Sequence, residues 1–185
     1  MNYSSRLFAF DCRNQGAAGV RWFNQLPDDH SHQLPDSATH FLYDVYIYFA
    51  PGSNVSAIEL DINHTSPANN LYLIGVQCFL GNGRWHVTVN DRWVDTDNRC
   101  ISGSVPTGSW HHFQVKTSHD ASPGANISYE QVAVESLTCS GKPCESVAQS
   151  AGWAQSVGPN FQLDGDASSG GNITAYVSNL DIWYW

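Results

Sequence analysis

The segment Ala57-Ile58-Glu59-Leu60-Asp61-Ile62-Asn63 alternates strictly between apolar and polar residues. Successive side chains of a β-strand point to opposite faces, so this segment predicts a strand with one side in an apolar core and a carboxylate-bearing side turned outward. The same alternation recurs in five other segments, within 41–49, 73–78, 84–89, 112–116 and 160–164. A helical bundle cannot bury faces of period two, and we therefore predict an all-β chain with little helix.

Clusters of turn-forming residues separate these segments at intervals typical of a β-sandwich. Ala50-Pro51-Gly52-Ser53 and Ser122-Pro123-Gly124 are two examples, and runs rich in Val, Ile, Tyr, Phe and Trp lie between such clusters. We predict strands at about 41–49, 56–63, 71–79, 84–89, 110–118, 127–138, 160–164 and 173–184. All-β sandwiches of this length commonly form one unit, so residues 1–185 are predicted to be a single domain.

The composition argues against several classes of partner. Only 14% of the residues are charged, the net charge is −9, and the chain has no basic run. Attraction to a phosphate backbone therefore lacks a source, which makes nucleic acid and an anionic membrane surface poor partners. No apolar segment approaches the length of a transmembrane helix, so no membrane insertion is expected. A surface rich in Ser, Thr, Asn and Gln is common in extracellular β proteins, and we expect a secreted protein whose signal peptide has been removed.

The chain has five cysteines and no Cys-X-X-Cys pair, which argues against a zinc site. Cys78 and Cys100 flank a hairpin-like segment, and Cys139 and Cys144 enclose a short turn that contains Gly and Pro. In a secreted protein these positions predict two disulfides, Cys78–Cys100 and Cys139–Cys144, and leave Cys12 free. The alternative is that all five cysteines are reduced thiols in the core.

The polar sides of the alternating strands form the candidate ligand site. If these strands were neighbours in one sheet, their polar sides would make a continuous wall of amides, imidazoles, tyrosines and paired acids, unlike the Lys, Glu and Thr of an ordinary solvated face. Such a wall suits a ligand with many hydroxyl groups. We predict that the ligand contacts Tyr46, Glu59, Asp61, Gln77, His86, His112 and Gln162. The alternative is a solvated outer face without a ligand.

Several motifs occur in an order that resembles a known family. They are Thr39-His-Phe-Leu-Tyr-Asp44, Ala57-Ile-Glu-Leu-Asp61, Gly75-Val-Gln-Cys78, Trp110-His-His-Phe113, Asn160-Phe-Gln-Leu-Asp-Gly-Asp166 and the closing Val177-Ser-Asn-Leu-Asp-Ile-Trp-Tyr-Trp185. Over residues 22–185 the chain resembles the concanavalin A-like lectin and glucanase domains (LamG-like jelly rolls) of secreted bacterial proteins. The resemblance implies a jelly-roll β-sandwich of two antiparallel sheets, with a concave polar face that binds an oligo- or polysaccharide.

The pair Glu59 and Asp61 has three interpretations under this resemblance. In the endoglucanases of this fold the matching residues are a nucleophile and a helper acid, but the acid/base position here holds His64, or Asn63 if the strand has no bulge. In legume-type lectins a similar strand supplies carboxylates to metal ions, which makes Glu59 and Asp61 candidate ligands together with Asn63. In the third interpretation the two acids bind sugar hydroxyls or neighbouring side chains.

A calcium ion is the one cofactor that the sequence suggests. The segment Asp164-Gly165-Asp166 carries two carboxylates, and we name Asp164 and Asp166 as candidate Ca²⁺ ligands. Calcium takes six to eight oxygen ligands, which is more than this segment supplies alone.

The aromatic residues, seven Trp and eight Tyr, are numerous for this length. We expect Trp110, Trp183 and Trp185 to lie in the core. Exposed rings that could stack on a pyranose are predicted at Tyr46, Tyr48, Trp93 and Trp153. The sequence as a whole favours a secreted, monomeric carbohydrate-binding domain. Two alternatives remain: a glycoside hydrolase that uses Glu59 and Asp61, and a non-catalytic adhesion or structural module of a cell-surface protein.

Overall fold

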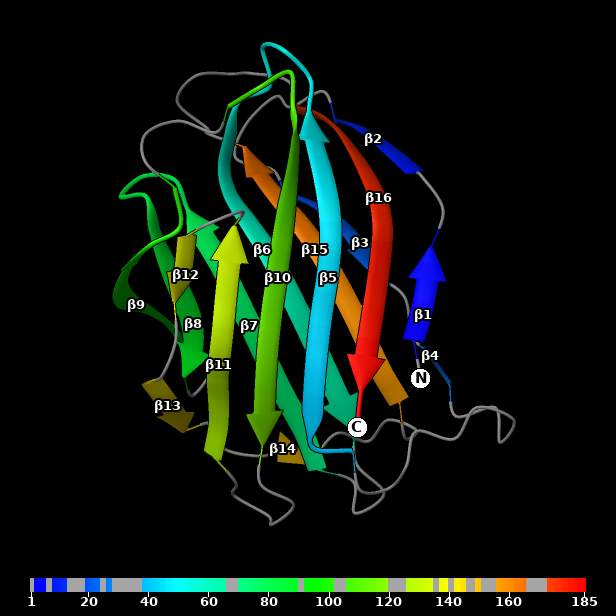
Figure 1. The fold of residues 1–185 in the computed structure, drawn as a ribbon, viewed down its shortest axis with the longest axis vertical. Helices are drawn as coiled ribbons and strands as arrows, with labels where there is room; N and C mark the ends of the chain where they lie inside the picture. Colours follow the sequence, from blue (N-terminus) through cyan, green and yellow to red (C-terminus); the bar gives the residue numbers. More distant parts are fainter. Residues whose placement is uncertain are drawn as a thin grey trace.

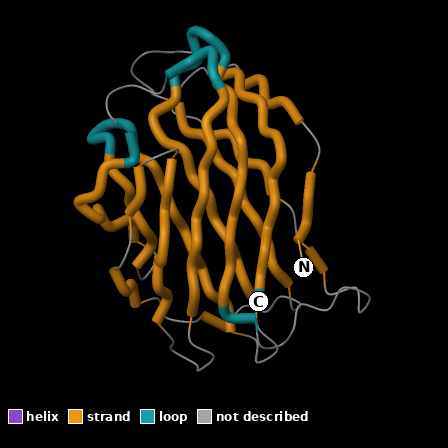
Figure 2. The backbone as a smooth tube through the Cα atoms, in the orientation of Figure 1, coloured by secondary structure: helices purple, strands orange, loops and turns teal. Residues whose placement is uncertain are grey.

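The computed structural model consists of strands and connecting turns, with no helix among the residues that it describes (Figure 2). The described residues are 2–5, 8–12, 19–23, 26–27, 38–65, 70–89, 92–101, 106–119, 126–134, 137–139, 142–145, 149–150, 156–165 and 173–185. Within this part of the chain no helix is long and apolar enough to cross a membrane. The prediction of an all-β chain is therefore confirmed.

Two antiparallel sheets pack face to face (Figure 1). The front sheet, which is nearer the viewer in Figure 1, has the strand order β1-β16-β5-β10-β11-β12, with β2 paired to β16 and β13 paired to β11. Its strands are β1 (Asn2–Ser5), β2 (Phe8–Cys12), β5 (His40–Phe49), β10 (Trp110–His119), β11 (Asn126–Val134), β12 (Leu137–Cys139), β13 (Lys142–Glu145) and β16 (Ile173–Tyr184).

The back sheet has the order β3-β15-β6-β7-β8-β9, with β4 paired to β15 and β14 paired to β7. Its strands are β3 (Gly19–Phe23), β4 (Leu26–Pro27), β6 (Val55–Thr65), β7 (Asn70–Phe79), β8 (Arg84–Val89), β9 (Arg92–Arg99), β14 (Gln149–Ser150) and β15 (Ser156–Gly165). The front and back sheets each combine strands from distant parts of the sequence, as expected of a jelly roll.

The core lies between the two sheets and follows the predicted alternation. On β6 the apolar residues Ile58, Leu60 and Ile62 are buried against the front sheet, which contributes residues such as Phe41 and Val45. Burial of these apolar side chains is the main force that holds the two sheets together, at about 25 cal/mol for each Å² removed from water. Since the period of a strand is two, the polar residues between them must face outward.

The polar sides of the six predicted strands do not form one wall, and that expectation was wrong. The strands β5 and β10 belong to the front sheet, whereas β6, β7, β8 and β15 belong to the back sheet. The outer faces of two packed sheets point in opposite directions, so the polar residues divide between two separate surfaces. Alternation shows which side of a strand is buried, but it does not show which sheet the strand joins.

The prediction that Trp110, Trp183 and Trp185 lie in the core was also wrong, because all three are exposed. Trp110 and Trp183 occupy outward positions of β10 and β16, where their neighbours in sequence, such as Ile182, are buried instead. Among the tryptophans whose side chains the structure describes, Trp85 on β8 is the one in the core. Tyr46 and Trp93 are exposed, as predicted, whereas Tyr48 is only partly exposed, and Trp153 lies outside the described residues.

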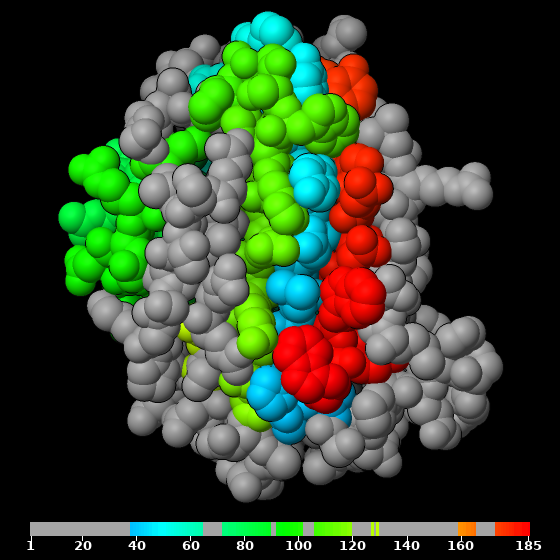
Figure 3. Space-filling model, in the orientation of Figure 1, coloured from blue at the N-terminus to red at the C-terminus, as the bar shows by residue number. Residues whose placement is uncertain are grey.

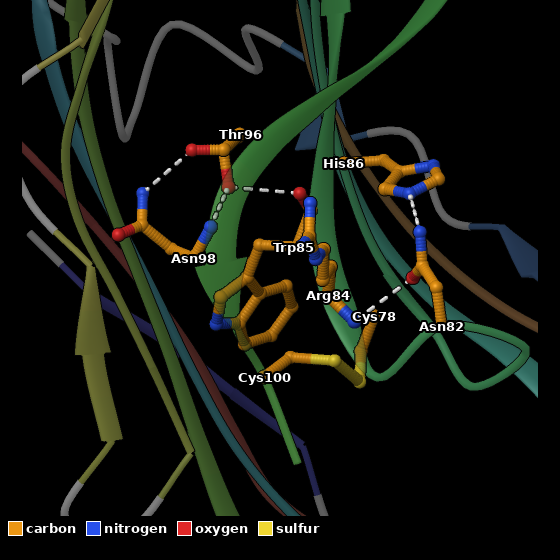
Figure 4. The surroundings of a disulfide bond; sticks show 8 residues. All are labelled: Cys78, Asn82, Arg84, Trp85, His86, Thr96, Asn98 and Cys100. Carbon is orange, nitrogen blue, oxygen red and sulfur yellow. Dashed lines mark hydrogen bonds between the residues drawn. A yellow bond between two sulfur atoms is a disulfide. The ribbon is translucent and has the colours of Figure 1, made fainter. Parts of the chain in front are cut away.

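The predicted disulfide between Cys78 and Cys100 is present, with both cysteines fully buried beside Trp85 (Figure 4). The second predicted bond stays a prediction, because the side chains of Cys139 and Cys144 lie outside the described part of the structure. The strand register places Cys139 opposite Val132 and Cys144 opposite Ile127 on β11. Val132 and Ile127 are five positions apart, which corresponds to about 16 Å along a strand. A disulfide requires Cα atoms within roughly 7 Å, so this bond would require β12 or β13 to move away from β11. The prediction of a free Cys12 is equally untested.

Removal of the Cys78–Cys100 bond should destabilise the fold without changing its strand content. The bond closes a loop with a sequence separation of 22 residues, and loss of this constraint on the unfolded chain costs about 2–4 kcal/mol. We expect the double variant Cys78→Ser and Cys100→Ser to lower the free energy of unfolding by that amount in urea titrations. An unchanged unfolding midpoint would show that the bond contributes nothing to stability.

Candidate functional site

A row of polar side chains crosses the outer face of the back sheet. The strand register pairs Gln162 of β15 with Glu59 of β6, Glu59 with Gln77 of β7, Gln77 with His86 of β8, and His86 with Asp95 of β9. Directly opposed residues of antiparallel strands point to the same face, so the five side chains lie next to one another. We call this set, Gln162, Glu59, Gln77, His86 and Asp95, the central row.

The centre of this row is nearly enclosed, although it faces outward. Glu59 is only 6% exposed and Gln77 only 7%. The amide Nε2 of Gln77 donates a hydrogen bond to Oε1 of Glu59 at 2.9 Å. Because the two groups hold each other, the row presents oriented donors and acceptors without the loss of side-chain freedom that mobile surface residues would undergo on binding.

The surroundings of Glu59 disfavour ionisation of its carboxyl. Burial, followed by the nearby charges of Asp61 and Asp164, raises its pKa from 4.5 to about 8, and the hydrogen bond from Gln77 only partly opposes this shift. A protonated Glu59 is a hydrogen-bond donor as well as an acceptor. On the same strand as Asp164, Gln162 donates to the Asp164 carboxylate at 3.1 Å.

A second row lies beside the first and includes Asp61. Asn160 of β15 is directly opposite Asp61 and donates a hydrogen bond from its Nδ2 to Oδ2 of Asp61 at 2.9 Å. Gly75 of β7 lies on the other side of Asp61. A Cβ atom at Gly75 would lie 2.6 Å from the side chain of Thr88 and 3.2 Å from Asp61. Glycine is therefore required at this position for the close approach of its neighbours.

At the other end of the central row, His86 is surrounded by polar groups from the β7–β8 turn and from β9. The side-chain nitrogen of Asn82 lies 3.2 Å from Nε2 of His86 and also 3.2 Å from Oδ2 of Asp95. Arg84 contacts the carboxylates of Asp95 at 3.2 Å and Asp97 at 3.0 Å. Figure 4 shows His86 and Asn82 on one side of β8, and Trp85 with the disulfide on the other.

Two exposed aromatic residues flank this end of the row. Phe79 of β7 packs its ring 5.2 Å from the ring of His86, and Trp93 of β9 is opposite Thr88 on the outer face. Both are more than one third exposed. An aromatic ring beside a row of hydrogen-bonding groups is the combination that ligand sites commonly use.

The acid/base position of the endoglucanase pattern holds Asn63. The register between β6 and β15 runs without a bulge from Thr65 to Ala57, so Asn63 shares the outer face with Glu59 and Asp61. His64 instead points into the core, where its Nδ1 lies 3.0 Å from Nε2 of His119. Burial and the neighbouring His119 lower the pKa of His64 to about 4, so this imidazole is neutral and is not part of the site. An amide at position 63 cannot donate the proton that the endoglucanase mechanism requires.

Of the seven predicted ligand residues, five are brought together on the back sheet: Glu59, Asp61, Gln77, His86 and Gln162. Tyr46 and His112 lie on the outer face of the front sheet, on the opposite side of the sandwich, and the prediction that they share the site was wrong. Their rings stack on each other at 4.2 Å. Tyr46 and His112 lie apart from the other five residues because β5 and β10 belong to the front sheet, whereas β6, β7, β8 and β15 belong to the back sheet.

The described residues do not show a metal site. No group of three or more His, Cys, Asp and Glu side chains in this part of the chain has an arrangement that could hold a metal ion. Asp61 is held by Asn160, and Asp164 accepts from Gln162, so these carboxylates are engaged with protein donors. Asp166 lies outside the described residues, and the Ca²⁺ hypothesis for Asp164 and Asp166 stays a prediction.

Two residues of this face, Asp95 and Asn160, were not predicted from the sequence. The segment 92–99 is polar and has no apolar alternation, so it gave no strand signal, yet β9 forms the edge of the back sheet. Asn160 precedes Gln162 by two residues, so strand alternation places both side chains on the same face. This alternation was the signal from which Asn160 could have been predicted as a site residue.

The variant Glu59→Gln should stabilise the protein at alkaline pH. A folded pKa of about 8 against 4.5 means that the stability from protonated Glu59 is fully present below pH 4.5 and is lost as the pH rises towards 8. A glutamine cannot ionise, so it avoids this loss. The free energy of unfolding of the variant, measured relative to that of the wild type by urea titration, should therefore be roughly 2–4 kcal/mol more favourable at pH 9 than at pH 5. The exchange Asp181→Asn on the front sheet controls for the loss of one acid. The same difference at both pH values would contradict this assignment.

Comparison with known proteins identifies the fold. No family model matches the chain, and no curated protein has significant sequence similarity to it. The structure is similar to the alginate lyase Aly36B in complex with an alginate tetrasaccharide, with 13% identity, a TM-score of 0.55, and coverage of 94% of this chain and 79% of that one. It is also similar to the carbohydrate recognition domain of Emp47p, with 9% identity, a TM-score of 0.50, and coverage of 96% and 88%. The chain has the concanavalin A-like jelly-roll fold.

Proposed function

We propose that this chain is a secreted carbohydrate-binding domain that holds a neutral oligo- or polysaccharide on the outer face of its back sheet. The central row carries the proposal. Five polar side chains are aligned in register across five strands, and their amide, carboxyl and imidazole groups supply donors and acceptors along one line. A sugar chain carries hydroxyl groups along its length that both donate and accept hydrogen bonds, so its chemistry matches that of the row.

The fold supports the same class of ligand. The two similar structures are named for an alginate lyase and a carbohydrate recognition domain, so this fold accommodates saccharides in both. A fold does not determine a function, and the proposal therefore depends on the row itself. The buried Cys78–Cys100 bond supports secretion, because disulfides persist mainly in oxidising compartments.

The charge of the face favours a neutral glycan over a uronate. The central strands β15, β6 and β7 contain no Lys or Arg, and their outer face carries Glu59, Asp61 and Asp164. The arginines of this sheet lie on the flanking strands β3, β8 and β9. A polymer with a carboxylate on every sugar would meet the like charges of Asp61 and Asp164 beside the row, which costs binding free energy.

The variants Gln77→Ala and Gln162→Ala should each weaken glycan binding about tenfold, because each removes hydrogen bonds worth about 1.4 kcal/mol. Binding is measured by calorimetry with soluble fragments of cellulose, laminarin, xylan and mannan, and with alginate fragments as the anionic comparison. We expect at least one neutral fragment to bind and alginate to bind more weakly. Asn98→Ala is the matched control, since Asn98 is an amide that lies on the Trp85 side of β8 in Figure 4.

Three outcomes would contradict the proposal. They are no binding by any neutral fragment, a stronger affinity for alginate, and equal affinities for the wild type and both variants. A reducing-sugar assay on the same fragments tests the alternative of a glycoside hydrolase. Release of reducing ends that is lost in Glu59→Gln would replace the binding proposal with an enzymatic one.

A further inference from the structure

The outer face of the front sheet carries most of the large exposed aromatic residues of the described chain. Five such residues, each between 37% and 51% exposed, lie on β16, β5 and β10 or just after β16: Tyr46, Trp110, Tyr176, Trp183 and Trp185. Figure 3 looks directly onto this face, and the side chains of these three strands lie open along its centre. Exposed aromatic residues gathered on one face mark an interaction surface more often than chance placement does.

Three rings form a continuous row at one end of the face. Tyr176 of β16 is directly opposite Tyr48 of β5, and Tyr48 is opposite Trp110 of β10. The ring of Tyr48 lies 5.8 Å from that of Tyr176 and 5.6 Å from that of Trp110. We call Tyr176, Tyr48 and Trp110 the aromatic row. Rings that contact each other in this way are held in place before any ligand arrives.

Hydrogen-bonding groups lie directly beside the aromatic row. Tyr46 stacks on His112, which lies within 2.6 Å of Oδ1 of Asp44. Gln114 donates to the other oxygen of Asp44 at 2.7 Å. The carboxylate is therefore fixed in one orientation by two neighbours, and it retains lone pairs that can accept from hydroxyl groups of a ligand.

Further aromatic residues extend the surface along β16. The partners of Tyr176 and Trp183 on β5, Tyr48 and Leu42, are six positions apart, which corresponds to about 20 Å along the sheet. At this second end Trp185 stacks on His40 at 5.4 Å, and the ammonium of Lys116 lies 5.7 Å from the centre of the Trp185 ring. The face thus presents aromatic rings at both ends and polar groups between them.

We propose that this front face is a second carbohydrate-binding surface, suited to an extended chain of a neutral polysaccharide. The rings can stack on the apolar faces of the sugar units, and Asp44, Gln114 and His112 can bond their hydroxyl groups. The length of the surface fits an extended polymer better than a single sugar. This inference depends on residues of the front sheet alone and does not depend on the central row.

The charges of the face argue against a second copy of this chain as the occupant. On the outer sides of β16, β5 and β10 the described acids are Asp44 and Asp181, which are directly opposite each other, and the described cation is Lys116. Two copies packed through this face would bury four carboxylates with two ammonium groups. Burying this excess of negative charge is costly, whereas a neutral glycan adds no charge. The same two carboxylates disfavour a uronate polymer.

The two surfaces face opposite directions, because they are the outer faces of two packed sheets. A short oligosaccharide cannot reach both. In a particle of polysaccharide, one protein molecule can bind one sugar chain through its back sheet and a neighbouring sugar chain through its front sheet. The second contact then increases the overall affinity of the protein for the particle.

The test uses depletion of the protein from solution by particles of cellulose, insoluble β-glucan, xylan and mannan. We expect the double variant Trp110→Ala and Tyr176→Ala to lose at least tenfold in affinity for a particle that the wild type binds. Both side chains are exposed, so the fold should persist, and circular dichroism checks this. Val94→Ala, an exposed apolar truncation on β9, is the control and should bind as the wild type does.

The outcomes separate this inference from the proposed function. Gln77→Ala should still bind the particles through the front face, and the double variant should still bind soluble fragments through the central row. The inference is overturned if no particle is bound, if the double variant binds as well as the wild type, or if sedimentation shows a dimer that the double variant loses.

Discussion

The register of β15, β6, β7 and β8 is the constraint on which both the core and the candidate site depend. Ile58, Leu60 and Ile62 must face inward, and this requirement turns Glu59 and Asp61 outward. A slip of one residue would bring carboxylates into the core and expose the apolar residues, at a cost of many kcal/mol. The same burial that holds the sheets together therefore aligns the central row, and no separate device is needed to position it.

The residue at the centre of the site, Glu59, reduces the stability of the fold. Glu59 is an outward residue that is almost fully enclosed, and its neighbours Asp61 and Asp164 oppose its ionisation. A glutamine or a hydrophobic residue would be easier to bury at this position. Local groups that reduce stability are common at functional sites, because selection for binding or chemistry can outweigh their cost. Gly75 is a second example, because a glycine inside a strand reduces stability. Here it leaves room for Asp61 and Thr88 beside the row.

The sequence predicted the fold class, the main strands, the Cys78–Cys100 bond and the inward side of each alternating strand, because all of these follow from local pattern and turns. It could not predict which strands are neighbours, since that depends on packing between distant segments. Tyr46 and His112 were therefore assigned to the wrong surface. Trp110 and Trp183 were expected in the core on the basis of residue type, although their outward positions on β10 and β16 leave them exposed.

Two-dimensional NMR of the backbone amides during titration with a soluble neutral glycan fragment tests the central claim most directly. The account predicts that the resonances which shift map to β15, β6, β7 and β8, around Gln162, Glu59, Gln77 and His86, and that amides of the front sheet stay unchanged with a short fragment. Shifts that map to the loops alone, to the front sheet alone, or to no residue at a saturating concentration would contradict it.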